Sequence, residues 1–168
     1  MFTDDDDVVP ALGTILDEGR GALPYALIHG ESLVACAAWA LGHARVTAVD
    51  LGTRWAGLVD SGEPFVVHDS LCPMTPADFI AACLARSVET GAVVVGVDAI
   101  GTVLSPVVLP AAVVADLTDL PSTDLAELVR HLEARFVVER RVAPPAAARV
   151  SSAADVAALE RLTAPEPA

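Results

Sequence analysis

The stretch that decides the fold is Phe65–Pro76, which reads FVVHDSLCPMTP. A short apolar run stops at Asp69, a turn follows, and Thr75 and Pro76 begin a helix, because Thr is a common N-cap and Pro suits the first helical position. In an open α/β sheet, the residue that ends a strand lies at the carboxyl edge, where ligands bind. We therefore expect Asp69 to mark a functional site.

Apolar segments alternate with helix patterns along the rest of the chain. Strands are expected at 8–13, 45–51, 65–67, 92–97 and 136–142, and helices at 32–41, 75–90, 122–134 and from 152 onward. The segments 13–24 and 52–62 are expected to be loops, and 100–120 to hold a short return strand and a loop. This alternation predicts an α/β fold with a mainly parallel sheet, helices on both faces and right-handed crossovers.

The composition fits one such domain. The chain has 168 residues, of which 54 % are apolar and only 4 % aromatic, so Val-rich strands can be covered by Ala- and Leu-rich helices. We expect a single domain at 8–162, an acidic lead-in at 1–7 and a tail at 163–168.

The charge argues against two classes of partner. The net charge is −13, and all ten basic residues are arginine. Nucleic acids and anionic membrane surfaces both attract clustered cations, so neither partner is expected. The segment 92–117 is very apolar, but its Gly and Pro residues and Asp98 indicate buried strands with turns rather than a membrane-spanning helix.

Cysteine usage indicates a reducing compartment. Cys36, Cys72 and Cys83 are odd in number and widely spaced, which favours free thiols over a disulfide framework or a zinc site. Residues 1–7 lack the basic region of a secretory signal. We expect a cytoplasmic protein.

Several blocks, in order, resemble the 2-C-methyl-D-erythritol 4-phosphate cytidylyltransferases, which join CTP to methylerythritol 4-phosphate in isoprenoid precursor synthesis. His68, Asp69, Pro73, Thr75 and Pro76 match the family's "HDAARP-LTP" signature. Weaker matches cover 8–13 ("VVPAAG"), 23–30 ("PKQ-x-L-x-x-x-G"), 123–129 ("TDDASLVE") and 149–155 ("KITTPED"). The resemblance implies a Rossmann-like nucleotidyltransferase domain, a three-layer sandwich.

The resemblance also implies a nucleotide-binding loop after the first strand. Its backbone N–H groups would cradle the triphosphate of CTP. In this sequence the implied nucleotide-binding residues are Ala11, Gly13, Gly19 and Gly21.

The remaining implied roles fall on four residues. Arg20 and Arg149 would be the catalytic cations, Asp69 and Thr123 would contact substrate, and Asp69 would also ligate Mg²⁺ if the protein is active. Other interpretations of the same residues stay open. Asp69 can cap the backbone N–H groups of its turn, Thr123 can belong to an ordinary helix start, and Arg20 can be a solvated arginine. His68 is expected to be a half-buried, hydrogen-bonded histidine rather than a general base.

The chain departs from the family where the chemistry needs positive charge. Tyr25 and Arg149 stand at two lysine positions, and Cys72 stands at the signature arginine. Asp17 and Glu18 place negative charge in the loop. Two unit charges about 4 Å apart interact by roughly 4 kcal/mol at an effective dielectric constant of about 20, so this loop opposes triphosphate binding unless a metal ion or Arg20 compensates.

The family's protruding arm is expected to be missing. No basic residue occurs between Arg86 and Arg130, where the arm would carry an arginine for the partner subunit's sugar phosphate. The arm also builds the family's homodimer, so that dimer is not expected in its usual form.

Three functions remain as hypotheses. The first is a degenerate homologue with lost or weak catalysis and a binding or regulatory role, a pseudoenzyme. The second is an active Mg²⁺-dependent enzyme that joins CTP to methylerythritol 4-phosphate or a related polyol phosphate and releases pyrophosphate. The third is a non-catalytic module that forms a homodimer, or a heterodimer with an active relative, through an exposed apolar face near 100–114.

Overall fold

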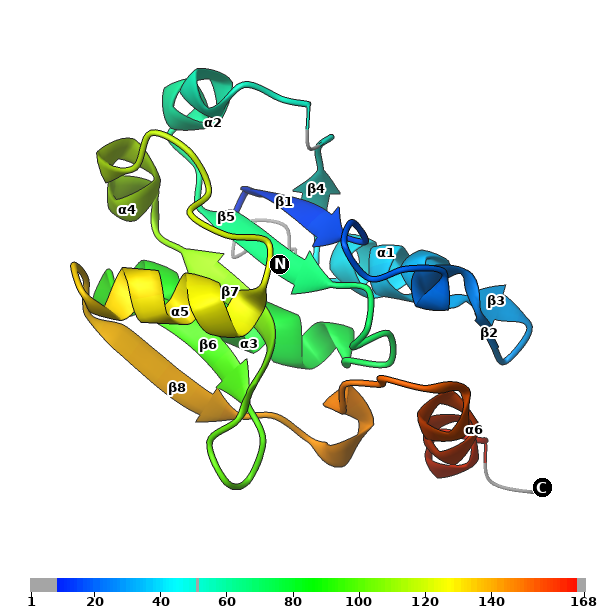
Figure 1. Ribbon diagram of the computed structural model, residues 1–168. Helices are drawn as coiled ribbons and strands as arrows, with labels where there is room; N and C mark the ends of the chain where they lie inside the picture. The colour runs from blue at the N-terminus through cyan, green and yellow to red at the C-terminus, as the bar shows by residue number, and fades with distance from the viewer. Residues whose placement is uncertain (1–8, 51, 166–168) are drawn as a thin grey trace, which may run out of the picture.

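The computed structural model describes residues 9–50 and 52–165, so the expected acidic lead-in at 1–7 and the last residues of the expected tail lie outside the described residues. A six-stranded sheet forms its centre, in the order β4-β1-β5-β7-β6-β8 (Figure 1). The strands are β1 (Ala11–Leu16), β4 (Val46–Ala48), β5 (Phe65–Asp69), β6 (Val93–Val97), β7 (Val103–Leu109) and β8 (Val138–Val142).

The sheet is mainly parallel, as predicted. β1 pairs in parallel with β4 and β5, and β6 pairs in parallel with β8. Only β7 runs the other way within this described sheet, antiparallel to both β5 and β6. The carboxyl ends of the other five strands therefore meet at one edge, together with the amino end of β7.

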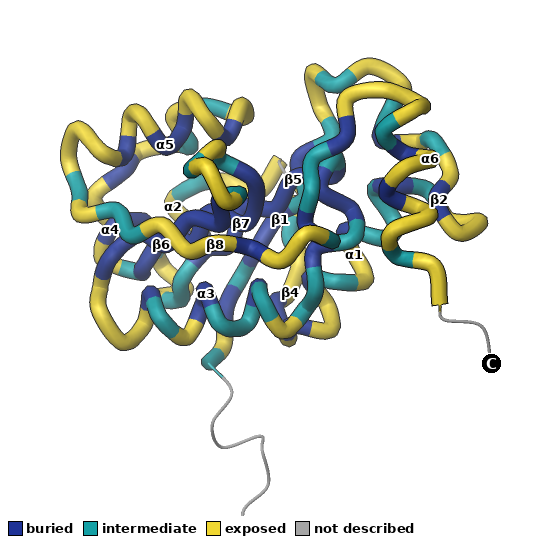
Figure 2. Tube along the Cα trace, turned by 90° about the horizontal axis from the view of Figure 1, so that it is seen from below, coloured by how far each residue is buried: buried dark blue, intermediate teal, exposed yellow. Residues whose placement is uncertain are grey.

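Helices cover both faces of the sheet, which confirms the three-layer α/β prediction (Figures 1 and 2). They are α1 (Leu33–His43), α2 (Trp55–Ser61), α3 (Ala77–Thr90), α4 (Ala111–Asp116), α5 (Leu125–Glu133) and α6 (Ala153–Leu162). One core joins β5, β6 and β7 to α2, α4 and α5, and a second core on the opposite face joins the sheet to α1 and α3.

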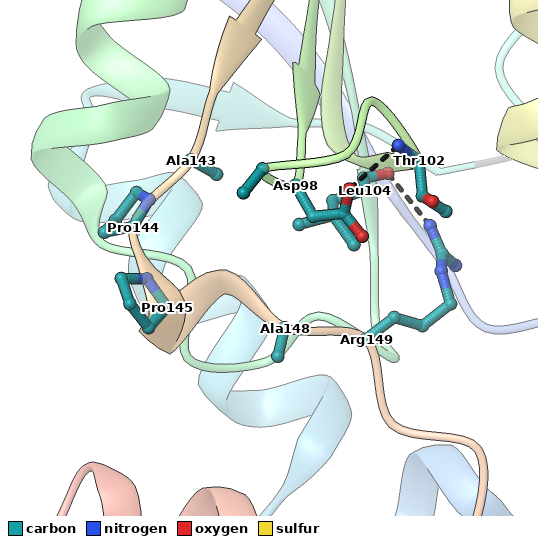
Figure 3. A pocket seen from close by; sticks show the side chains of 9 residues that line it. Asp98, Thr102, Leu104, Ala143, Pro144, Pro145, Ala148 and Arg149 are labelled. Atoms are coloured by element: carbon teal, nitrogen blue, oxygen red, sulfur yellow. Dashed lines mark hydrogen bonds between the residues drawn. The ribbon is translucent and has the colours of Figure 1, made fainter.

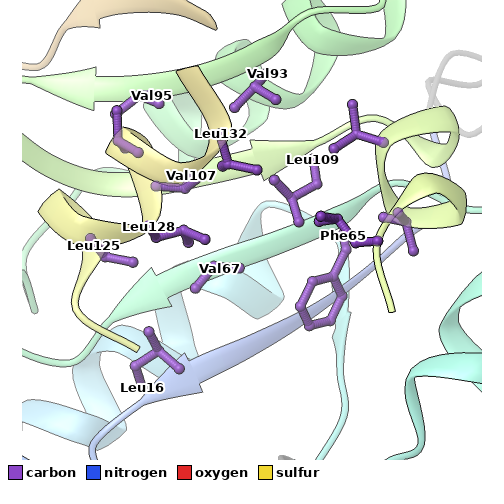
Figure 4. Packing of buried hydrophobic residues seen from close by; sticks show 14 of the residues in the cluster. Leu16, Phe65, Val67, Val93, Val95, Val107, Leu109, Leu125, Leu128 and Leu132 are labelled. Atoms are coloured by element: carbon purple, nitrogen blue, oxygen red, sulfur yellow. The ribbon is translucent and has the colours of Figure 1, made fainter. Parts of the chain in front are cut away.

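Alternation along β5 assigns side chains to these two cores. Phe65 and Val67 lie in the core formed with α2, α4 and α5, while Val66 lies in the core formed with α1 and α3. Figure 4 shows Leu125, Leu128 and Leu132 of α5 over the strands, and Val129 of the same helix is also buried in this core. Burying each such side chain stabilises the fold by roughly 1.5–3 kcal/mol. This burial fixes α5 over the sheet and its first turn at the edge where the carboxyl ends of the strands meet.

A smaller cluster attaches the C-terminal segment to this edge. Helix α6 packs on the short hairpin of β2 (Leu27–Ile28) and β3 (Glu31–Ser32), with 3-10 turns at η2 (Leu23–Tyr25) and η3 (Pro145–Ala147). The Val150 N–H donates to the Leu71 carbonyl at 2.8 Å. Residue 149 is therefore held beside the turn that follows Asp69.

The first strand differs from its prediction. It was expected to end at Gly13 in a turn, but it continues to Leu16, and the loop begins only afterwards. A Cβ at Gly13 would lie 2.6 Å from Val46 Cγ1 and 2.8 Å from the Val66 carbonyl oxygen. The glycine therefore permits close strand packing and does not form a turn.

Two expected loops contain regular structure. Residues 52–62 include α2, which buries Leu58 and ends at Gly62 in the left-handed conformation, φ 65°. In the stretch 100–120 the expected return strand is present as β7, which is seven residues long, and α4 stands where a loop was expected. Short helices with so few buried positions give almost no 3.6-residue periodicity, which is why the sequence did not predict them.

The apolar face expected near 100–114 is also absent from the surface. Ile100 is 89 % exposed, but the body of β7 and residues such as Val113 and Val114 are buried in the sheet core. Between Arg86 and Arg130, all described, the chain forms α3, β6, β7, α4 and α5 with no additional strand pair that would form an arm. No helix in the described part of the chain is long and apolar enough to cross a bilayer.

The start of α3 is another correction. Pro76 is the N-cap residue and Thr75 makes no side-chain cap; the Thr75 hydroxyl instead donates to the Cys72 carbonyl at 2.8 Å. The three cysteines are free thiols, as predicted, with Cys72 and Cys83 buried.

We predict that Gly13→Ala lowers the free energy of unfolding by about 1–3 kcal/mol, because the added Cβ overlaps a neighbouring strand. Urea unfolding followed by circular dichroism measures the change. Gly57→Ala is the matched control, because no atom lies within 4 Å of a Cβ built there and Ala favours a helix over Gly by about 1 kcal/mol. Equal stability of Gly13→Ala and the parent chain would contradict the close-packing explanation.

Candidate functional site

Asp69 ends β5 as a fully buried carboxylate held by two arginines. Arg20 Nε donates to Oδ1 at 2.8 Å and Arg20 Nη2 to Oδ2 at 3.2 Å, and Arg149 Nη1 donates to Oδ2. The Leu71 N–H donates to Oδ1 at 2.9 Å, so Asp69 also caps its own turn, as one of the open interpretations expected. We call Arg20, Asp69 and Arg149 the arginine clasp.

The clasp keeps Asp69 ionised. Burial alone would raise the Asp69 pKa, but the hydrogen bond from Arg20, the charge of Arg149 and the Leu71 N–H together lower it below its ordinary value. Charge-assisted and bidentate contacts of this kind are among the stronger hydrogen bonds in proteins. The buried carboxylate is therefore a fixed negative charge with its acceptor positions filled.

Arg20 reaches the clasp from the loop after β1. Its neighbours Gly19 and Gly21 both have positive φ, 73° and 63°, a conformation that suits glycine. Besides Asp69, Arg20 donates to the Glu18 carbonyl at 2.6 Å and to the Thr123 carbonyl at 2.8 Å. Only 10 % of its side chain is exposed. It is not a solvated arginine; it ties the loop to the sheet edge and to the segment before α5.

Arg149 approaches Asp69 from the opposite side. Its Nη2 donates to the Leu104 carbonyl at 2.9 Å, at the amino end of β7. The side chain is 30 % exposed. The guanidinium thus joins the C-terminal segment to two neighbouring strands, β5 and β7.

A cleft of about 390 Å³ opens above the clasp. Both arginines line it, together with the first turn of α5, where Asp124 is the N-cap and accepts from the Glu127 N–H at 2.9 Å. Its lining residues are Glu18, Gly19, Arg20, Leu71, Thr102, Val103, Thr123, Asp124, Leu125, Ala126 and Arg149. The cleft therefore carries carboxylates as well as arginines.

The implied site residues separate into two groups. Gly19, Arg20, Thr123 and Arg149 line the cleft, with Asp69 beneath them. Ala11 and Gly13 lie within β1, where Ala11 is part of the core that faces α1 and α3. Gly21 flanks Arg20 in the loop, outside the cleft lining. The structure thus brings five of the eight residues together.

His68 lies next to Asp69 but does not line the cleft. Its Nδ1 is 2.6 Å from the Ser105 Oγ, and that hydroxyl also accepts the Asp69 N–H at 3.0 Å. Its Nε2 is buried with no hydrogen-bond partner among the described residues. Burial lowers the pKa of His68 to about 4, so the ring is neutral at pH 7. The hydrogen bond was predicted, but the side chain is fully buried rather than half-buried.

Sequence reasoning missed Ser105 and the Leu104 carbonyl. Ser105 lies within an apolar strand, and a backbone acceptor carries no residue-specific signal, so nothing in the sequence marks either one.

The acidic loop makes a contact that the sequence did not predict. Tyr25, which stands at a lysine position of the resemblance, donates its hydroxyl hydrogen to Asp17 Oδ2 at 3.0 Å.

The donor set does not fit Mg²⁺. This ion requires octahedral oxygen ligands with free lone pairs, and the Asp69 oxygens accept from Arg20, Arg149 and Leu71. Across residues 9–50 and 52–165, no group of three or more His, Cys, Asp or Glu side chains is arranged to hold a metal. The four donors around Asp69 thus leave its carboxylate no free lone pair for such an ion.

The sheet order, the covering helices and the cleft at the carboxyl edge define a three-layer α/β fold with a mainly parallel six-stranded sheet. No protein-family model matches the sequence, and no curated protein matches it either. Among solved structures, a 4-diphosphocytidyl-2C-methyl-D-erythritol synthase from Anaerococcus prevotii superposes with a TM-score of 0.64 at 9 % identity, covering 94 % of this chain and 96 % of that one.

Two further solved structures agree. The 2-C-methyl-D-erythritol 4-phosphate cytidylyltransferase from Thermus thermophilus gives a TM-score of 0.59 at 17 % identity, covering 92 % of this chain and 98 % of that one. Another 4-diphosphocytidyl-2C-methyl-D-erythritol synthase gives 0.63 at 13 % identity, with the same coverage. At these identities the likeness establishes the fold.

We predict that Asp69→Asn lowers the free energy of unfolding by about 3–5 kcal/mol, because removal of one charge leaves two arginines without their buried counterion. Guanidinium-induced unfolding measures it. The control is Glu139→Gln, which breaks the surface ion pair with Arg86 and should change stability by no more than about 1 kcal/mol. Similar effects of the two substitutions would show that the clasp is not a buried ion pair.

We also predict a pH-dependent loss of stability from His68. Its pKa is about 4 in the folded state against an ordinary histidine value of 6.5, so below pH 6.5 the unfolded chain binds a proton that the folded protein does not. Stability should fall by roughly 3 kcal/mol between pH 6.5 and 4. Across this window, the free energy of unfolding should depend more steeply on pH for the parent chain than for His68→Gln. An equal slope in the variant would show that His68 is not the group responsible.

Proposed function

We propose that this protein is a divergent relative of the methylerythritol phosphate cytidylyltransferases that has lost efficient nucleotidyl transfer and acts by binding. The observation that carries the proposal is the arginine clasp. The two cations that the resemblance assigns to phosphate, Arg20 and Arg149, both bind the carboxylate of Asp69.

A triphosphate needs donors that are free to meet it. Nucleotidyl transfer develops negative charge on the phosphate oxygens, and enzymes stabilise that charge with cations aimed at it. Every nitrogen of the Arg20 guanidinium already donates within the protein, to Asp69, Glu18 and Thr123. Releasing them for a phosphate would leave Asp69 buried and less well paired.

The charges around the cleft add to this obstacle. Glu18 and Asp124 line it and Asp69 lies beneath, against Arg20 and Arg149, so three carboxylates face two guanidinium groups. A metal ion would ordinarily offset such an excess, but the carboxylate at the strand end does not fit one. Repulsion therefore acts on CTP before any chemistry begins.

One observation favours the alternative, an active cytidylyltransferase acting on CTP and methylerythritol 4-phosphate or a related polyol phosphate. Gly19, Arg20, Thr123 and Arg149 share one cleft, which is the arrangement the resemblance implies. Pairing with an active relative, as a regulatory heterodimer or as a homodimer, is a further form of the binding role in our proposal.

Incubation with CTP, methylerythritol 4-phosphate and MgCl₂ tests the proposal through pyrophosphate release. We expect no release above that of Arg149→Gln, and no rise in melting temperature on adding CTP, because a ligand that binds only the folded state must stabilise it. CTP at about 100 times its Kd would add about 2.7 kcal/mol. Ordinary enzymes turn over at about 1 s⁻¹ or faster. Pyrophosphate release at such a rate, together with its loss in Arg149→Gln, would contradict the proposal and support the alternative.

A further inference from the structure

A second cavity, of about 420 Å³, lies beside the cleft. It is bounded by the turn between β6 and β7, residues 98–102, and by the segment 143–149 that follows β8 (Figure 3). Its volume falls in the range of small-molecule pockets, about 300–1,000 Å³. Thr102 and Arg149 line both the cavity and the cleft.

The cavity has an apolar wall and a polar wall. Ala143, Pro144, Pro145 and Ala148 surround one side, with Leu104 beneath, while the Arg149 guanidinium lies across from the prolines (Figure 3). Pocket surfaces of mostly apolar residues with a few fixed polar groups are typical of ligand sites. The proline rings are rigid, so they suit a flat apolar body.

Hydrogen bonds hold both walls in place without a ligand. Asp98 Oδ1 accepts the N–H groups of Ile100 at 3.0 Å and Thr102 at 2.9 Å, which fixes the turn. The Ala143 N–H donates to the Val97 carbonyl at 2.7 Å, which fixes the start of the other wall. A preformed cavity loses little conformational freedom on binding.

The charged residues in the lining determine which polar group a ligand can place in the cavity. Among the described residues that line the cavity, Arg149 is the one cation, and its charge is partly balanced by Asp69. Its Nη1 donates to Asp69 and its Nη2 to the Leu104 carbonyl, so the guanidinium group can accommodate one further acceptor but not a polyanion. Asp98, the one anion of the lining, turns an oxygen toward the N–H groups of its own turn.

We infer that this cavity is a second binding site, for a small molecule with a flat apolar body and a single carboxylate. The carboxylate meets Arg149 and the body lies between the prolines and Leu104. The site shares Thr102 and Arg149 with the neighbouring cleft, but binding there needs neither CTP nor a metal ion, so it does not depend on whether the cleft transfers nucleotides.

The test is a methyl NMR titration of the full chain with 2-naphthoate, without nucleotide. We expect saturable shifts of the Ala99, Ala143, Ala148 and Leu104 methyl signals, with a Kd of about 1 mM, as ligand efficiency gives for a probe of this size. The uncharged 2-naphthalenemethanol should bind about fivefold more weakly, because it lacks the carboxylate that meets Arg149.

Two variants narrow the cavity from opposite walls, Ala148→Leu and Ala99→Leu. Each should weaken 2-naphthoate binding by about tenfold or more, and because Ala99 is exposed, the second change leaves the core intact. Ala38→Leu is the matched control, since Ala38 lines a separate hollow beside Trp39. This variant should bind 2-naphthoate with the same affinity as the parent chain. Shifts confined to residues outside the cavity, or unchanged binding by both narrowing variants, would overturn the inference.

Discussion

The strand-end site depends on one buried charge. A carboxylate removed from water must be paired, because an uncompensated ion in the interior is strongly destabilising. Asp69 is paired from two directions, by arginines 49 residues before it and 80 residues after it. Its neutralisation therefore fixes the loop after β1, the start of α5 and the C-terminal segment at the same point of the sheet.

This arrangement separates the geometry of the site from its chemistry. The fold places an aspartate, two arginines and a loop together at the carboxyl edge of the sheet. Charge pairing inside the protein then decides whether these groups are available to a ligand. The same guanidinium groups that could stabilise a phosphate are here part of the fold, and the structural role accounts for their low exposure, 10 % for Arg20 and 30 % for Arg149.

The sequence predicted the positions of the main strands and helices better than the contacts between distant residues. The apolar runs at 65–67 and 92–97 correspond to β5 and β6. The helices expected at 32–41, at 122–134 and from 152 onward begin within three residues of α1, α5 and α6. Periodicity could not reveal α2 or the length of β1, because neither depends on an amphipathic stripe. The clasp escaped prediction for another reason: its members were recognised singly, but pairing between distant residues is set by the tertiary fold.

The reversed direction of β7 has a consequence for how this edge can change. In a fully parallel sheet, only strand-to-helix connections reach the carboxyl edge. Here a hairpin turn, Asp98 to Thr102, reaches it as well, and no helix is attached to that turn. Residues added between β6 and β7 would lengthen a wall of the cavity while leaving the sheet and its covering helices in place. The hairpin is thus the part of this edge whose length evolution can alter most freely.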